Sequence, residues 1–197
     1  AQENVAVDVA EQIRDVLLGL PARSAVNIPG LSAEIMERLK PHLQLAETVG
    51  RLVSQLSGGQ VQELELRLQG EFASHPSQPL LIASLKGLLG AVLGDSINFV
   101  NASLEAKARG IRVLEVKDEA SRDFAGGSLQ ITSRGDQGSR SVTGTVFADG
   151  DLRITSIDEF PVNVTPSSHM LFTRHRDMPG IIGQLGSMLG EHNVNIA

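Results

Sequence analysis

The stretch Val61-Gln62-Glu63-Leu64-Glu65-Leu66-Arg67-Leu68-Gln69 decides how the centre of this chain folds. Leucines occupy every second position from 64 to 68, and charged residues stand between them. Successive side chains of a strand point to opposite faces, so this alternation separates an apolar face from a charged one. The stretch therefore predicts a strand that is buried on one face only.

Apolar residues at helical spacing occur on both sides of this strand. Upstream, we expect one short helix over residues 32–39 and a second over 43–56, the latter ending at Ser57-Gly58-Gly59. Downstream, the apolar run 79–94 is shorter than a membrane span and contains Lys86. That run therefore predicts a buried helix.

The second half of the central region has the pattern of an antiparallel meander. Turns are expected at residues 135–138 and at Asp149-Gly150, a strong two-residue hairpin signal. Residues 95–110 are expected to be helical in part. Further strands are predicted over residues 111–116, 129–132, 142–147, 152–157 and 162–164. The fold class predicted is α/β (α+β), with a mostly antiparallel sheet and packed helices.

Two breaks divide the chain into three parts. An amphipathic helix is expected over residues 3–18, and Pro29-Gly30 follows it as a boundary. Pro166 marks a second boundary. The predicted domains are residues 1–28, 29–166 and 167–197, and both ends of the chain look cut.

Composition limits the classes of function. The formal net charge is −6, and the chain has no Trp and no Tyr, which argues against a nucleic-acid partner. The absence of Cys excludes disulfides and thiolate chemistry within this chain. The histidines show no metal-ligand spacing, so structural or surface roles are expected for His42, His75, His169 and His192. No signal peptide is visible, and a cytoplasmic setting without membrane or metal is expected.

The motif with most chemistry is Arg174-His175-Arg176-Asp177-Met178-Pro179-Gly180. It lies between a strand predicted over residues 169–174 and a helix predicted over 179–190, with Pro179 at the first helical position. The helix start offers N–H groups to a carboxylate, Asp177 offers a charge to an ammonium group, and Asn195 offers a donor and an acceptor. Gly180 permits close approach of a ligand or of another backbone. Together these groups suit a free amino acid, although the same residues also form a plain capped turn.

Glycines follow the motif at Gly180, Gly183 and Gly186. They do not form the G-x-G-x-x-G loop of dinucleotide-binding proteins, and close packing of the helix on a sheet is the expected role. Residues 193–197 are expected to begin a second strand.

Residues 169–197 resemble the first strand, helix and second-strand start of an ACT domain. The resemblance rests on Asp177, Pro179, Gly180 and Val194-Asn195-Ile196. It implies a ferredoxin-like βαββαβ domain, of which the chain would hold the first half, and amino-acid binding between two copies.

Two further segments resemble the D-3-phosphoglycerate dehydrogenase family. Residues 1–13 and 25–27 are similar to the closing helix of its catalytic domain. The stretches 85–89, 99–102 and 106–111 are similar to the intervening, allosteric-substrate-binding domain of its long forms. The resemblance covers nearly the whole chain, in the order of the family.

This resemblance implies the regulatory portion of an enzyme that oxidises 3-phosphoglycerate with NAD at the start of serine biosynthesis. The catalytic residues and the NAD site would lie upstream of Ala1, so this chain alone would not be catalytic. Serine would bind at His175, Asp177 and Asn195, with Pro179 and Gly180 shaping the loop. The family further implies a homo-oligomer with ACT–ACT pairing.

Other features leave alternatives open. Lys117 and Arg122 fall where relatives have basic residues at an anion or substrate site, but a solvated charged loop is the simpler interpretation. Asn101 is expected to hydrogen-bond at a helix end. The glycines of the apolar helix, Gly87, Gly90 and Gly94, fit close packing on the sheet or a subunit interface. Alternative functions are the β-type segment of an iron–sulfur L-serine dehydratase and a stand-alone amino-acid-binding module.

Overall fold

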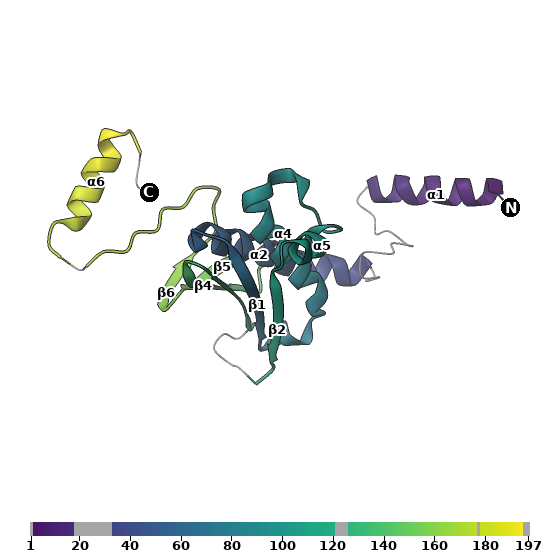
Figure 1. The fold of residues 1–197 in the computed structure, drawn as a ribbon, viewed down its shortest axis with the longest axis horizontal. Coiled ribbons are helices and arrows are strands. Elements are labelled where there is room, and N and C mark those ends of the chain that lie inside the picture. Colours follow the sequence, from purple (N-terminus) through teal and green to yellow (C-terminus); the bar gives the residue numbers. More distant parts are fainter. Residues whose placement is uncertain (1, 18–32, 121–125, 177, 195–197) are drawn as a thin grey trace. The chain divides into compact units, whose positions relative to one another are not determined.

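The computed structural model describes residues 2–17, 33–120, 126–176 and 178–194. Contacts within the chain define two units, residues 1–166 and 167–197, and each is described by itself. The first unit contains a six-stranded sheet in the order β2-β1-β3-β4-β5-β6 (Figure 1). The predicted boundary at Pro29-Gly30 lies outside the described residues.

The sheet is mostly antiparallel, as predicted. Only β1 and β2 pair in parallel, and all other neighbours are antiparallel. The strands are β1 (Val61–Gln69), β2 (Arg112–Asp118), β3 (Ser128–Gly135), β4 (Gly138–Val146), β5 (Leu152–Ile157) and β6 (Phe160–Val164). The strand that the leucine alternation predicts is therefore confirmed at both ends.

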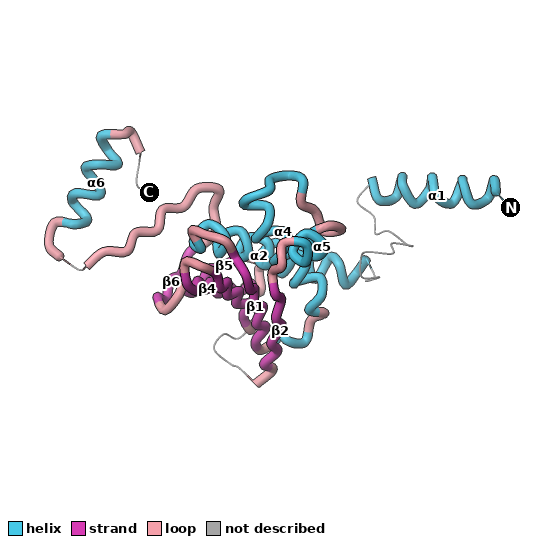
Figure 2. The backbone as a smooth tube through the Cα atoms, viewed as in Figure 1, coloured by secondary structure: helices cyan, strands magenta, loops and turns pink. Residues whose placement is uncertain are grey.

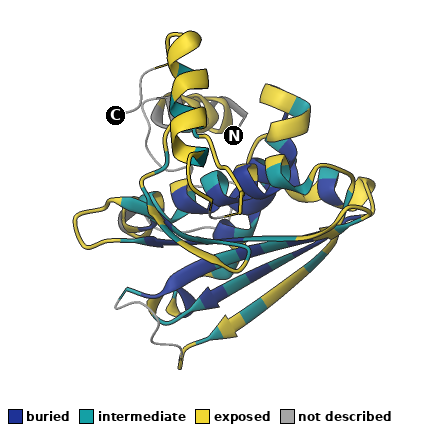
Figure 3. Cartoon of the chain, turned by 90° about the vertical axis from the view of Figure 1, so that its left-hand side faces the viewer, coloured by how far each residue is buried: buried dark blue, intermediate teal, exposed yellow. Residues whose placement is uncertain are grey.

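Helices α2 and α4 pack along each other and lie against the sheet (Figures 2 and 3). The helices are α1 (Gln2–Leu17), α2 (Ala33–Ser57), α3 (Glu71–Ser74), α4 (Ser77–Leu93), α5 (Ala102–Ala108) and α6 (Ile181–Glu191), with a 3-10 turn η1 (Gly94–Ser96) before α5. The prediction of two helices over residues 32–39 and 43–56 is wrong. Pro41 removes one backbone donor, but α2 continues through it, because residues on both sides of Pro41 bury their side chains in the same core.

The core lies between these helices and one face of the sheet. Leu64, Leu66 and Leu68 of β1 are completely buried, and so are Leu45 and Val49 of α2. Each such side chain contributes roughly 2 kcal/mol to folding through the apolar surface that it removes from water. The charged residues of β1 face the opposite side of the sheet, as the alternation predicts.

Two glycines let α2 and α4 approach closely. A Cβ atom on Gly50 would lie 2.2 Å from the carbonyl oxygen of Ser84, and one on Gly87 would lie 2.0 Å from that of Glu47. Close packing is thus confirmed for Gly87, but its partner is a helix and not the sheet. A Cβ on Gly90 or Gly94 would meet no atom of the described chain within 4 Å.

Helix α4 is the buried helix that the apolar run predicts. Within the described residues, the stretch 77–96 is the one that is long and apolar enough to cross a membrane, and half of it is buried inside the protein. Its buried side chains include Leu80, Leu85 and Leu88, on the helix that packs along α2. These contacts identify α4 as a core helix.

A polar contact holds the end of α2 to the sheet. Arg140 of β4 donates through Nε to the carbonyl oxygen of Leu56 at 3.2 Å, and its guanidinium pairs with Asp158 at 3.3 Å. The hydroxyls of Ser57 and Ser133 lie 2.7 Å apart. A cation at the carboxyl end of a helix satisfies free carbonyls and opposes the negative end of the dipole.

Candidate functional site

The loop before α6 is built around Gly180. This glycine has φ 91° and ψ −15° and stands immediately before the first helical residue, Ile181. A positive φ of this size is costly for a residue with a Cβ, and it stops the helix from extending backwards to Pro179. The prediction of Pro179 at the first helical position is therefore wrong by two residues. A Cβ atom on Gly180 would meet no described atom within 4 Å. The positive φ, and not a crowded neighbour, is therefore the reason for a glycine at this position.

The start of α6 presents backbone donors. The N–H of Gln184 bonds to the carbonyl oxygen of Gly180 at 2.9 Å and closes the first turn. Helix geometry gives Ile182 and Gly183 no carbonyl partner inside the helix, because their N–H groups belong to the first turn. These donors and the dipole of an eleven-residue helix make this end suitable for a carboxylate.

The predicted side-chain contacts of this loop are only partly described. His175 is exposed, and its Nδ1 lies 3.0 Å from the carbonyl oxygen of Arg176. Pro179 is also exposed. Asp177 and Asn195 lie outside the described residues, so the arrangement of the serine-binding set stays a prediction.

Helix α6 ends in a Schellman motif. The N–H of Asn193 bonds to Gly190 at 3.0 Å, and that of Val194 bonds back to Leu189 at 2.9 Å. Asn193 has φ 57°, the left-handed conformation that terminates helices. The expected strand therefore does not begin at residue 193, and its remaining residues 195–197 lie outside the described chain.

The strand predicted over residues 169–174 is also wrong. Residues 165–176 form neither helix nor strand, and Figure 2 shows them as loop. Apolar residues at these positions satisfy the pattern of a strand, but a strand also needs a neighbour with which to pair. Leu171 remains 64% exposed in this segment.

The glycines of α6 do not form a dinucleotide site. Gly183 and Gly186 lie inside the helix, and a Cβ on either would meet no described atom within 4 Å. Among residues 165–176 and 178–180, no strand leads into this helix, whereas a dinucleotide loop needs one before it. The described residues of this unit therefore do not fit NAD.

Lys117 lies on the edge strand β2, beside the segment that follows α3. Its Nζ donates to the carbonyl oxygen of His75 at 3.2 Å. Arg122, its predicted partner in an anion site, lies outside the described residues. The anion site stays a prediction, while the structure gives Lys117 a contact with the backbone.

Asn101 has the role that the sequence predicts. It stands at the start of α5, accepts from the N–H of Asn98 at 2.8 Å, and donates to the carbonyl oxygen of Ser96 at 2.8 Å. These two bonds connect Asn101 to the loop that precedes α5. The role as a hydrogen-bonding residue at a helix end is confirmed.

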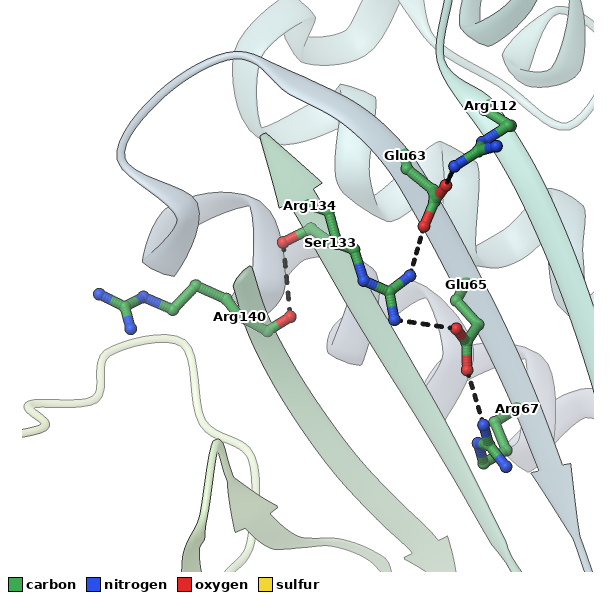
Figure 4. Close-up of polar contacts among 7 residues, drawn as sticks. All are labelled: Glu63, Glu65, Arg67, Arg112, Ser133, Arg134 and Arg140. Atoms are coloured by element: carbon green, nitrogen blue, oxygen red, sulfur yellow. Dashed lines mark hydrogen bonds and ion pairs between the residues drawn. The ribbon is translucent and has the colours of Figure 1, made fainter. Parts of the chain in front are cut away.

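Sequence reasoning missed a network of charges on the face of the sheet opposite the buried leucines of β1 (Figure 4). Glu63 of β1 pairs with Arg112 of β2 and with Arg134 of β3, so it joins three neighbouring strands. Arg134 reaches Glu65 at 3.1 Å, and Glu65 reaches Arg67 at 2.9 Å. The alternation within β1 placed these charges on one face, but their partners depend on strand register.

The network changes the acidity of both carboxylates. Hydrogen bonding from Arg134 lowers the pKa of Glu63 against an opposing effect of burial, and Arg112 lowers it further. Burial raises the pKa of Glu65, but the hydrogen bonds from Arg134 and Arg67 outweigh it, and the net direction is downward. Both groups are therefore held in the ionised form.

Two of the histidines that look scattered along the sequence meet in the fold. The ring centroids of His42 and His75 lie 4.6 Å apart, and both rings contact Phe72. Among the described residues, no group of three or more His, Cys, Asp or Glu side chains is arranged to hold a metal ion. A structural role for both residues agrees with the prediction, but their proximity could not be predicted from spacing.

Comparison with known proteins decides the family. The sequence model of the D-3-phosphoglycerate dehydrogenase intervening domain matches residues 38–158, more than half of the chain. This chain belongs to the D-3-phosphoglycerate dehydrogenase family. The D-3-phosphoglycerate dehydrogenase of Synechocystis is 60% identical over 198 aligned residues, which cover all of this chain and 36% of that enzyme. The enzyme of Archaeoglobus fulgidus is 34% identical, and that of Bacillus subtilis is 33% identical, each across the whole chain and 37% of the relative.

The chain thus spans little more than a third of the length of these relatives. Strands β1 to β5 and the helices α4 and α5 fall within the matched region. Helix α2 begins five residues before it, and β6 begins two residues after it. The helix α6 and the loop before it follow that domain.

Proposed function

We propose that this chain is the regulatory portion of an NAD-dependent D-3-phosphoglycerate dehydrogenase and mediates feedback inhibition by L-serine. The enzyme would oxidise 3-phosphoglycerate to 3-phosphohydroxypyruvate, the first committed step of serine biosynthesis. The intervening domain at residues 38–158 carries this proposal, together with relatives that match the full chain. The family resemblance implies that the cofactor would bind in the part of the enzyme that this chain does not span.

The effector site is proposed at the start of α6. A serine carboxylate would accept hydrogen bonds from the N–H groups of Ile182 and Gly183, where the helix dipole favours negative charge. Asp177 would pair with the ammonium group of serine. Asn195 would hydrogen-bond to the carboxylate and to the ammonium group. His175 lies five residues before Gly180 and is exposed, so it is available to a ligand.

Self-association fits the exposed face of α6. Ile182 is 71% exposed and Met188 is 61% exposed, and no residue of this helix is buried. A helix with such a face gains stability by covering it with another element. ACT–ACT pairing within a homo-oligomer would supply that cover and would complete the serine site from two copies.

Two alternatives are less well supported. The segment of an iron–sulfur L-serine dehydratase would not explain matches across the whole chain to dehydrogenases. A stand-alone amino-acid-binding module would not need the intervening domain. A cytoplasmic location remains part of the proposal, and the net charge of −6 argues against a nucleic-acid partner.

An anion site at Lys117 and Arg122 is less well supported than the serine site. The ammonium of Lys117 already has a carbonyl partner in His75, and Asp118 and Glu119 follow it in the chain. A free phosphate would have to compete with those neighbours. Replacement of Lys117 by Ala is expected to leave serine inhibition unchanged.

The direct test uses the full-length enzyme that contains this chain. Asn195→Ala should abolish serine inhibition and spare dehydrogenase turnover, because the proposed role of Asn195 is to bind the effector alone. Asn163→Ala, on the exposed side of β6, is the matched control and should keep inhibition. Serine inhibition that survives in Asn195→Ala contradicts the proposed site.

A further inference from the structure

Three rings from different parts of the intervening domain form one cluster. His42 belongs to α2, Phe72 belongs to α3, and His75 follows α3 directly. The centroid distances are 4.8 Å between His42 and Phe72, 4.6 Å between the two histidines, and 6.2 Å between Phe72 and His75. All three contacts are edge-to-face, and Phe72 is completely buried. We name these three residues the ring cluster.

Each histidine of the ring cluster has one nitrogen in a buried position without a partner. Neither Nδ1 of His42 nor Nε2 of His75 has a hydrogen-bond partner within the part of the chain that the structure describes. A neutral imidazole can leave one nitrogen without a proton, whereas an imidazolium carries an N–H donor on both nitrogens. At His75, protonation would therefore bury a donor with no acceptor, which is costly. At His42, a backbone hydrogen bond with Arg38 raises the pKa, but burial and His75 outweigh it and the net direction is downward.

Charges around the ring cluster oppose protonation as a group. Arg38 of α2 and Lys117 of β2 are cations that act on His75, and a charged His75 acts on His42. Glu71 of α3 is the one described carboxylate that favours the charged forms of both rings. Two imidazolium groups at this separation would repel each other as well.

We propose that the ring cluster is a pH-sensitive latch, closed while both imidazoles are neutral and opened by their protonation. The part released would be α3 with the loop that follows it. This segment is a single helical turn, held by the bonds from Ala73 N–H to Gly70 at 3.0 Å and from His75 N–H to Phe72 at 3.2 Å. Opening would expose Phe72 and withdraw the carbonyl of His75 from Lys117 at the edge of the sheet.

The direction of the pH effect follows from linkage. Burial lowers the pKa of His42, and the neighbouring His75 lowers it further. Burial also lowers the pKa of His75, and Glu71 only partly offsets this. The open state therefore binds more protons than the closed state. The latch has its full stability above the ordinary histidine value of 6.5, and it loses that stability as the pH falls through the lowered values.

Hydrogen exchange on the full chain tests the latch. The amides of Ala73 and His75 are followed at pH 7.5 and at pH 5.5, with rates corrected for intrinsic exchange. Their protection should fall at the lower pH, by up to about tenfold for each unit by which a histidine pKa differs between closed and open states. The amides of Leu129 and Ile131, in the middle of β3, should keep their protection and thereby exclude global unfolding.

Variants without the two imidazoles distinguish opening of the latch from a general loss of stability in acid. His42→Phe combined with His75→Phe keeps two aromatic rings and removes the protons, so protection of Ala73 should no longer depend on pH. His169→Phe, at an exposed histidine, should behave like the wild type. Protection that is flat in the wild type, or equally pH-dependent in the double variant, overturns the proposal.

Direct titration covers the case in which the double variant does not fold. The ring signals of His42 and His75 in the wild-type chain should titrate below the ordinary histidine value of 6.5. Titration of both rings at or above that value would overturn the latch equally.

Discussion

The intervening domain and the unit that follows it differ in what their described residues bury. Every buried apolar residue of the described chain lies between Leu39 and Ile154, and none lies in residues 167–176 or 178–194 (Figure 3). The sheet and helices of the first region close a core of their own. Helix α6 instead leaves Ile182 and Met188 largely exposed. The first region therefore has the contacts to fold by itself, while under the proposed function a second copy would cover the exposed face of α6.

The largest effect is expected from the core of the intervening domain. Leu66→Ala removes a completely buried side chain and leaves a cavity between β1 and the helices, so the free energy of unfolding should fall by about 2–5 kcal/mol. The matched substitution in the other region, Ile182→Ala, should change it by less than about 0.5 kcal/mol. Urea denaturation of the chain measures both. An equal loss of unfolding free energy in both variants would show that the two regions do not differ in packing.

A smaller effect is expected where α2 and α4 touch. Gly87→Ala places a methyl group against the carbonyl oxygen of Glu47, and the required shift of two helices should cost about 1–3 kcal/mol. Gly90→Ala lies in the same helix with open space around it, and it should stabilise the protein by roughly 0.5–1 kcal/mol. The midpoint of thermal unfolding should therefore fall for Gly87→Ala and rise for Gly90→Ala. A loss at both positions would mean that helix contact is not what distinguishes them.

The smallest effect concerns the charged face of the sheet. The pKa of Glu63 is lower in the folded protein than its ordinary value of 4.5, so the unfolded state binds more protons in acid. Its stabilising contribution is present above pH 4.5 and is lost as the pH falls through the lowered value. Arg112 is 73% exposed and Arg134 is 46% exposed, so water screens the pairs and the effect should be modest.

Comparison of Glu63→Gln with Glu119→Gln checks this effect in denaturant midpoints between pH 7 and pH 3. The gap between wild type and Glu63→Gln should narrow in acid, while Glu119→Gln should follow the wild type at every pH. A gap that stays constant would assign the role of Glu63 to packing instead of charge.

The spacing of apolar residues and the residue types at turns predicted most of the intervening domain. The leucine alternation gave β1 with its correct ends, and Asp149-Gly150 marked the hairpin between β4 and β5. Pro41 led to a wrong division of α2, because a local breaker was outweighed by burial on both sides of it. The strand predicted at residues 169–174 failed for the opposite reason, since its pattern had no neighbour to pair with among the described residues.

The contacts between distant residues could not be predicted. Glu63 meets Arg112 and Arg134 only because of strand register, and register was not determined by any one stretch. His42 and His75 meet because α2 and α3 pack together, although they are more than thirty positions apart. The predicted effector site rests on resemblance, and Asp177 and Asn195 remain outside the described residues.

Removal of everything after Pro166 from the full-length enzyme separates the intervening domain from the unit that contains α6. The shortened enzyme should retain dehydrogenase turnover, because the catalytic residues and the self-contained intervening domain remain. Its turnover should no longer respond to L-serine at concentrations that inhibit the intact enzyme. Serine inhibition that persists in the shortened enzyme would contradict the assignment of the regulatory site to the unit that contains α6.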